Sequence, residues 1–163
     1  MKILTHPNPV LKQKAHEVDP LNDGELRGLV SAMAQTMYEA PGIGLAAPQV
    51  GVQKRVIVYD LDDGLVALCN PRIVSRSDEE ETDEEACLSV PGISVEVPRS
   101  LTVTCEAVSL EGEPVSIVAE GFYARLLQHE IDHLDGFLII DRAEPEERKA
   151  AIHRYFELHE ESA

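Results

Sequence analysis

His129 and His133 stand four residues apart, with Glu130 directly after the first of them, in the order HExxH. An α-helix has about 3.6 residues per turn, so both imidazoles lie on one helical face and can reach one metal ion. Glu130 then projects beside the ion, where it can accept a proton from water. This spacing predicts metal-dependent hydrolysis with Glu130 as the acid/base.

A catalytic metal site usually has three protein ligands and one open position. The extended protease pattern HExxHxxGxxH needs a third histidine at the position that Ile139 occupies, so that pattern fails. Glu157, further along the chain, is the ligand that a small metalloprotease would use. Cys87, where an acidic run ends, would supply a thiolate, which is a strong ligand. The residues alone leave Glu157 and Cys87 open as ligands, and also leave Cys87 open as a buried, inert thiol.

Two helices are predicted in the last third of the chain, and the first of them carries the candidate motif. A helix is predicted over residues 121–134 and carries HExxH. Because it is apolar at Phe122, Leu126, Leu127, Ile131 and Leu134, we expect it in the interior, which disfavours an exposed face merely decorated with histidines. A last helix is predicted from Glu144 to Leu158, with proline in its first turn.

The first half of the chain predicts one helix and then a loop. Apolar residues recur at helical spacing between Asp23 and Pro41, with Asp23 as the cap, Pro41 as the stop, and Met33 and Met37 in the core. Residues 42–51 are small and apolar and predict a loop. They lack the GxGxxG spacing, which excludes a dinucleotide site.

Short β-prone runs fill the middle of the chain, and we expect antiparallel strands at residues 55–59, 65–69, 72–74, 101–105 and 114–118. Asn70-Pro71 is expected to separate the second run from the third. Residues 78–85 are almost all acidic and predict a solvated loop, since their spacing lacks the pattern of a calcium site. Strands between helices indicate an α+β domain, with antiparallel sheets, an N-terminal helix and a C-terminal helix.

Composition limits the remaining classes of function. A chain of 163 residues fits a single domain, 1–163, and its net charge of -16 argues against nucleic-acid binding. Cys69, Cys87 and Cys105 form no CxxC pair, and we expect Cys69 and Cys105 to be buried thiols within strands. No apolar run suits a membrane, and the first residues show no secretory signal, so we expect a cytoplasmic protein.

Three segments in order resemble the signature motifs of peptide deformylases: residues 42–49 (GIGLAAPQ), 85–89 (EACLS) and 128–136 (QHEIDHLDG). Residues 6–11 (HPNPVL) and 97–99 (VPR) also look like that family, so the resemblance spans nearly the whole chain. The resemblance implies an enzyme that removes the N-formyl group from the initiator methionine of nascent polypeptides, with the ribosome as the expected place of action. It also implies a central helix carrying HExxH and a monomer of the bacterial form with a C-terminal helix.

By the same resemblance, Cys87, His129 and His133 are the ligands of ferrous iron, which zinc, nickel or cobalt can replace. Gln49 and the backbone N–H of Leu88 are expected to stabilise negative charge on the formyl oxygen. The methionine pocket is expected to comprise Ile43, Phe122, the stem of Arg125, and Leu126.

The peptide is expected to bind as an added strand near residues 86–88. Gly44 would leave room for its backbone, and Arg99 would position it, unless Arg99 is an exposed structural residue.

One departure is Ala86, which stands where the family has glycine beside the cysteine. At positive φ, alanine would cost on the order of 1 kcal/mol, and its methyl group lies where a peptide would bind. We expect an active enzyme. The alternatives are a deformylase for a specialised formylated substrate, a small metalloprotease using Glu157, or a non-catalytic deformylase-like binding protein.

Overall fold

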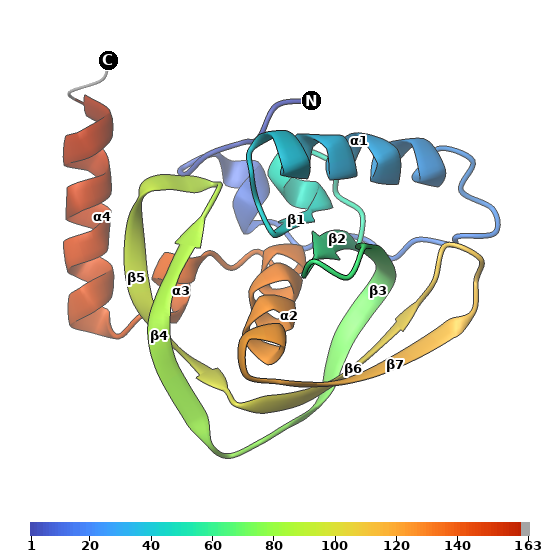
Figure 1. Cartoon of the computed structure of the whole chain (residues 1–163). Helices are drawn as coiled ribbons and strands as arrows, with labels where there is room; N and C mark the ends of the chain where they lie inside the picture. Colours follow the sequence, from blue (N-terminus) through green and yellow to red (C-terminus); the bar gives the residue numbers. More distant parts are fainter. Residues whose placement is uncertain (161–163) are drawn as a thin grey trace.

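The computed structural model describes residues 1–160 (Figure 1). Its helices are α1 (Leu26–Glu39), α2 (Gly121–Leu134), α3 (Ile139–Arg142) and α4 (Pro145–Glu160), with 3-10 turns η1 (Pro9–Lys12) and η2 (Ala47–Val50). Its strands are β1 (Gly44–Ala46), β2 (Val56–Asp60), β3 (Leu65–Arg76), β4 (Glu80–Cys87), β5 (Val90–Ser100), β6 (Thr102–Val108) and β7 (Pro114–Glu120).

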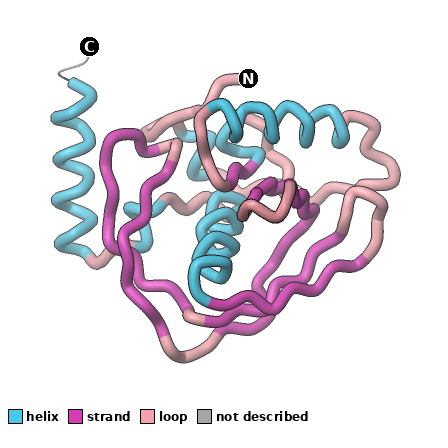
Figure 2. The backbone as a smooth tube through the Cα atoms, in the orientation of Figure 1, coloured by secondary structure: helices cyan, strands magenta, loops and turns pink. Residues whose placement is uncertain are grey.

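The strands form two antiparallel sheets with α2 between them (Figure 2). The larger sheet has the order β1-β2-β3-β6-β7, and the smaller one is the β4-β5 hairpin. Helix α1 covers the β1-β2 end of the larger sheet, and α4 lies along β5 on the outside of the hairpin (Figure 1). The predicted α+β class is therefore confirmed, with the HExxH helix at the centre.

Helix α2 forms over the predicted residues because one of its faces is apolar. Leu127 and Leu134 are fully buried against the larger sheet, as expected of an interior helix. Phe122 is an exception, because 58% of its surface is exposed, so its predicted burial is wrong. The first turn of α2 therefore reaches the surface, and only the turns that carry the motif are interior.

Helix α1 buries Met33 and Met37 completely, as predicted. The predicted cap is displaced, however, since the helix begins at Leu26 and no side chain caps it. Asp23 instead accepts a hydrogen bond from the N–H of Glu25 and pairs with Lys54 at 2.7 Å. The helix therefore begins one short turn later than the position of Asp23 predicts.

Three predicted irregular segments are regular. Residues 42–51 contain β1 and η2, because Gly44 to Ala46 pair with Tyr59 to Ile57 of β2. Asn70-Pro71 does not end a strand; β3 continues through it with a shift of register, and Asn70 has a positive φ of 52°. Most of the acidic segment, from Glu80 to Glu85, belongs to strand β4, which pairs with β5. In β1, β3 and β4, pairing with a neighbouring strand overrides the local sequence signal for a loop or turn.

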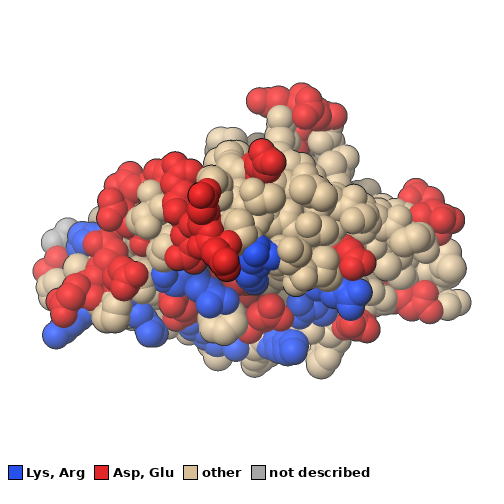
Figure 3. All heavy atoms as spheres, turned by 90° about the horizontal axis from the view of Figure 1, so that it is seen from below, with Lys and Arg blue, Asp and Glu red and all other residues tan. Residues whose placement is uncertain are grey.

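Acidic side chains gather at several places on the face shown in Figure 3, and Lys and Arg form a band between them. The net negative charge is thus unevenly distributed over this face. Among residues 1–160, no helix combines the length and apolar character that crossing a bilayer requires.

Candidate metal centre

Cys87, His129 and His133 converge between α2 and the end of β4. Their potential ligand atoms all lie within 4.8 Å of one another, and Cys87 Sγ is 3.4 Å from His133 Nε2. One thiolate and two imidazoles suit first-row divalent ions such as iron, cobalt, nickel and zinc. Burial and the neighbouring His129 lower the pKa of His133, which keeps its ring neutral, as a ligand must be. The donor set therefore fits a metal ion.

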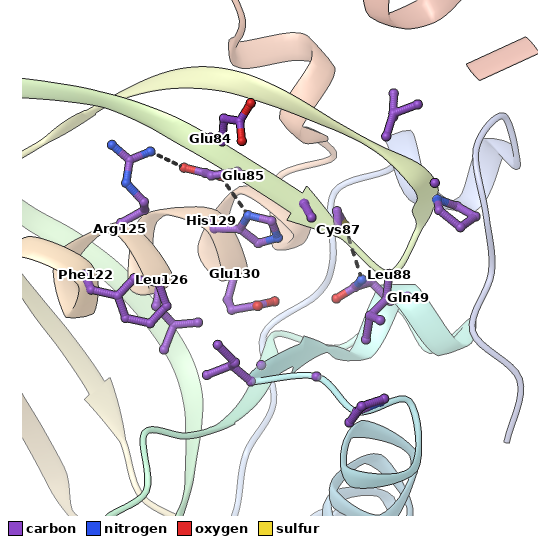
Figure 4. Close-up of a pocket in the computed structure, with 18 residues that line it drawn as sticks. Gln49, Glu84, Glu85, Cys87, Leu88, Phe122, Arg125, Leu126, His129 and Glu130 are labelled. Atoms are coloured by element: carbon purple, nitrogen blue, oxygen red, sulfur yellow. Dashed lines mark hydrogen bonds and ion pairs between the residues drawn. The ribbon is translucent and has the colours of Figure 1, made fainter. Parts of the chain in front are cut away.

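Glu85 forms a hydrogen bond with the His129 ring, with 2.9 Å between its Oε1 and Nδ1 of the histidine (Figure 4). The same carboxylate accepts two hydrogen bonds from Arg99, at 2.9 and 3.0 Å, and one from Arg125 at 2.6 Å. Burial alone would raise the pKa of Glu85, but its bonds to His129 and Arg99 lower it to about 2. An ionised carboxylate that accepts from Nδ1 leaves Nε2 of His129 facing the other two ligand residues.

Arg99 is buried, with 5% of its surface exposed, and it also donates to Asp132 at 2.5 Å. It does not line the large cavity beside the metal-ligand cluster. The alternative of an exposed arginine is therefore wrong, whereas a role of Arg99 in positioning the peptide stays a prediction. Arg99 is instead the cation that joins Glu85 of β4 to Asp132 of α2.

A cavity of about 550 Å³ opens beside the cluster. Its walls include the expected substrate residues Ile43, Gly44, Ala86, Phe122, Arg125 and Leu126, together with Gln49 and Leu88 (Figure 4). The guanidinium of Arg125 donates to Glu85 and to the carbonyls of Val97 and Glu81. These bonds occupy its charged end, and the stem is left as the part expected to line the cavity. β1, η2, β4 and α2 supply these residues, except for Ile43 just before β1 and Leu88 in the turn after β4.

Glu130 lies in this cavity and is buried, with 3% exposure. Burial raises the pKa of its carboxyl to about 7, although the nearby His129 acts to lower it. Within residues 1–160, its Oε1 has no hydrogen-bond partner. A carboxyl that changes its charge near neutral pH, with an oxygen free for a ligand, is suited to proton transfer.

Gly44 leaves the space that Glu130 occupies. A Cβ built on Gly44 would lie 2.5 Å from Oε2 of Glu130 and 3.1 Å from Cδ1 of Leu126. The glycine is thus needed for the position of the carboxylate, in addition to its expected role toward the substrate backbone.

Gln49 has its amide fixed at both ends. Its Oε1 accepts from the N–H of Ala46 at 2.9 Å, so the NH₂ group must face the other way. That NH₂ group donates to Ser89 Oγ at 3.1 Å and lies 3.8 Å from Cys87 Sγ. Its donors therefore point toward the ligand cluster.

Two questions left open by the sequence are answered by the structure. Ala86 is not among the residues with positive φ, so alanine strains no backbone there. Glu157 is exposed on α4, pairs with His153, and is absent from the ligand cluster of residues 1–160. The metalloprotease alternative that depends on Glu157 is therefore wrong.

Sequence reasoning overlooked Glu85, Ser89 and Asp132, whose side chains position the groups described above. Glu85 and Ser89 belong to the EACLS segment and Asp132 to the HExxH helix, so the motifs contained the signal. Their partners come from distant parts of the chain, which only the fold brings together.

The fold and the cluster define a metal hydrolase of the HExxH class. The family model for polypeptide deformylases matches residues 1–149. The chain is 52% identical over 153 residues to the peptide deformylase of Natranaerobius thermophilus, covering 93% of this chain and 97% of that protein. It is 47% identical over 142 residues to that of Pelotomaculum thermopropionicum, covering 87% and 90%.

Solved structures agree. The peptide deformylase from Legionella pneumophila superposes with a TM-score of 0.90 at 40% identity, covering 99% of this chain and 96% of that one. The enzyme from Thermotoga maritima gives a TM-score of 0.84 at 44% identity, covering 88% and 97%. The chain belongs to the peptide deformylase family, metal-dependent hydrolases that remove N-formyl groups from nascent polypeptides.

Proposed function

We propose that the chain performs this deformylation with a ferrous ion held by Cys87, His129 and His133. The observation that carries the proposal is the convergence of their ligand atoms within 4.8 Å beside a cavity of about 550 Å³. Zinc, nickel or cobalt would suit the same donors. When bound, the ion would act as a Lewis acid toward water and the formyl group.

Glu130 is the acid/base of the proposed reaction. Its carboxylate accepts a proton from the attacking water and then delivers that proton to the leaving amine, so formate and a free N-terminus result. The elevated pKa of about 7 favours a group that can both accept and return a proton near neutral pH. Gly44 supports this role by leaving the carboxylate its space.

Gln49 and the backbone N–H of Leu88 are the proposed donors to the formyl oxygen, on which negative charge develops. The fixed orientation of the Gln49 amide supports this role, because a donor held in place needs no rearrangement during the reaction. Leu88 follows Cys87 directly, and both residues line the cavity.

The methionine side chain would lie against the apolar wall made by Ile43, Phe122, Leu126 and the stem of Arg125. In the described residues, β4 pairs with β5 alone, so its other edge is available to a peptide in extended form. Ala86 lies on this strand and lines the cavity, and its methyl group would touch the bound peptide.

We further propose that the protein is a monomer with one catalytic domain that acts in the cytoplasm on chains emerging from the ribosome. The resemblance to bacterial deformylases with a C-terminal helix supports this, together with α4 itself.

Formate release from a formyl-Met-Ala-Ser peptide by the iron-loaded protein tests the function. Glu130→Gln should lower kcat by about 10²-fold or more while the protein keeps its metal. Acetyl-Met-Ala-Ser is the matched control substrate, and its bulkier acyl group should react far more slowly. Release of no formate by the metal-replete wild-type protein would refute the proposed function.

A further inference from the structure

Helix α4 lies along β5, the outer strand of the β4-β5 hairpin (Figure 1). Between Cys87 and Val90 the chain turns at Leu88 and Ser89, and β5 then begins. Pro91 and Gly92, just beyond, line the same cavity as the proposed catalytic residues. The position of residues 88–92 therefore determines one wall of the substrate cavity.

The last turn of α4 contacts that wall directly. Nε2 of His159 donates to the carbonyl of Pro91 at 3.0 Å. Leu158 packs so closely on Gly92 that a Cβ there would lie 2.3 Å from Leu158 Cδ2. Gly92 also has a positive φ of 89°, so both its backbone and its neighbour require glycine.

A second line of hydrogen bonds runs from α4 to the catalytic amide. The hydroxyl of buried Tyr155 donates to the carbonyl of His6 at 2.6 Å, and the N–H of His6 donates to the carbonyl of Ser89 at 2.8 Å. The hydroxyl of Ser89 in turn accepts a hydrogen bond from the side chain of Gln49 at 3.1 Å. The backbone N–H of Ser89 donates to Cys87 Sγ, with 3.4 Å between nitrogen and sulfur. Tyr155 is thus connected through two residues to both Gln49 and the proposed thiolate ligand.

We propose that the last two turns of α4, through Tyr155, Leu158 and His159, are a positioning element of the active site that holds residues 87–92 in their working geometry. Tyr155 acts on Ser89 and through it on Gln49, so it affects turnover. His159 and Leu158 act on the cavity wall at Pro91 and Gly92, so they affect binding of the peptide. The catalytic consequence rests on the proposed function, whereas the mechanical consequence does not.

The mechanical part is tested by hydrogen–deuterium exchange of the segment 86–93. Tyr155→Phe removes one hydroxyl and keeps the ring, and His159→Ala removes one donor. Both should speed exchange in this segment about threefold to tenfold, the range for loss of one hydrogen bond. Tyr38→Phe, which removes a hydroxyl bonded to Asp60 at 2.6 Å, and His153→Ala, at an exposed position, are the matched controls and should not.

The catalytic part is tested on formyl-Met peptides of two and five residues. Tyr155→Phe should lower kcat about threefold to tenfold on both peptides, and His159→Ala should raise KM by a similar factor on the longer one alone. His159→Gln, which keeps an N–H donor, should recover most of the loss. A variant with lower thermal stability but unchanged exchange, kcat and KM would show α4 to be structural only and would overturn the proposal.

Gly92→Ala provides an independent check, with Gly64→Ala as its control. Both glycines have positive φ, 89° and 104°, but a Cβ on Gly64 would meet nothing within 4 Å. Gly92→Ala should therefore raise KM more than Gly64→Ala, and adding Leu158→Ala should reverse part of the increase. Failure of wild-type turnover would refute the proposed function alone, because the exchange result stands without it.

Discussion

Gly44→Ala should separate catalysis from stability in this chain. The added Cβ would lie 2.5 Å from Oε2 and 3.0 Å from Cδ of Glu130, and 3.1 Å from Leu126. An ordinary van der Waals contact between carbon atoms is about 3.5 Å or more, so the carboxylate must move by roughly 1 Å. It is the far end of a flexible side chain, and its movement requires no backbone shift.

Gly44→Ala should therefore affect the rate of the reaction much more than the free energy of unfolding. Displacing a catalytic group by about 1 Å costs on the order of 10²-fold in rate, equivalent to about 2.7 kcal/mol in the activation free energy. The free energy of unfolding should change by less than about 1 kcal/mol, because Gly44 does not have a positive φ and alanine fits its strand.

The assay is kcat for a formyl-Met peptide, measured beside metal content and urea unfolding. Gly28→Ala in α1 is the control, because a Cβ there meets nothing within 4 Å; it should leave kcat unchanged and stabilise the helix by about 1 kcal/mol. Full kcat in Gly44→Ala, with Glu130→Gln inactive, would refute the assigned position of the carboxylate. Loss of metal in the same variant would place the damage at the ligands instead.

Three further predictions concern buried groups. Cys87→Ala should lose its metal in equilibrium dialysis while Cys105→Ala and Glu157→Ala retain theirs; equal retention would remove Cys87 from the ligand set. Arg99→Met should lower the free energy of unfolding by about 3–5 kcal/mol in urea titrations, because two buried carboxylates lose their shared cation, and a change below about 1 kcal/mol would contradict that network. Burial raises the pKa of Cys69 and Cys105 to about 11, whereas unfolded thiols titrate near about 8.5. Between those pH values the unfolded state binds fewer protons than the folded state, so the free energy of unfolding should fall by about 1.4 kcal/mol per pH unit for each thiol. The double variant with Cys69→Ala and Cys105→Ala should show a smaller dependence of the free energy of unfolding on pH. An unchanged dependence would mean that other groups cause it.

The parts of this fold that the sequence predicts well depend on local pattern. Helix α2 begins and ends where predicted, because its apolar face and its glycine boundaries act within a few residues. The helix alone brings His129, Glu130 and His133 to one face. Cys87 enters the site only through β4, so the third ligand needed either the fold or the resemblance of three motifs to a known family.

The acidic segment shows why strand β4 and the buried position of Glu85 could not be predicted from the sequence. Five of the eight residues of β4 are Asp or Glu, which locally favours a solvated loop. Pairing with β5 makes it a strand, and strand alternation then turns Glu85 and Cys87 inward while their neighbours stay exposed. Glu85 tolerates burial because Arg99 and Arg125, distant in sequence, surround it with charge. No local pattern contains those partners.

Ala86 gains its meaning from the same alternation. It lies between the two inward residues Glu85 and Cys87, pairs with Ser94, and faces outward along the cavity with φ outside the positive range. The alanine therefore imposes no backbone strain on the neighbouring ligand, and its only consequence is a methyl group against the bound peptide. Ala86→Gly should accordingly leave metal content unchanged and alter KM for formyl-Met peptides more than kcat. A loss of metal in that variant would mean that the side chain supports Cys87 after all.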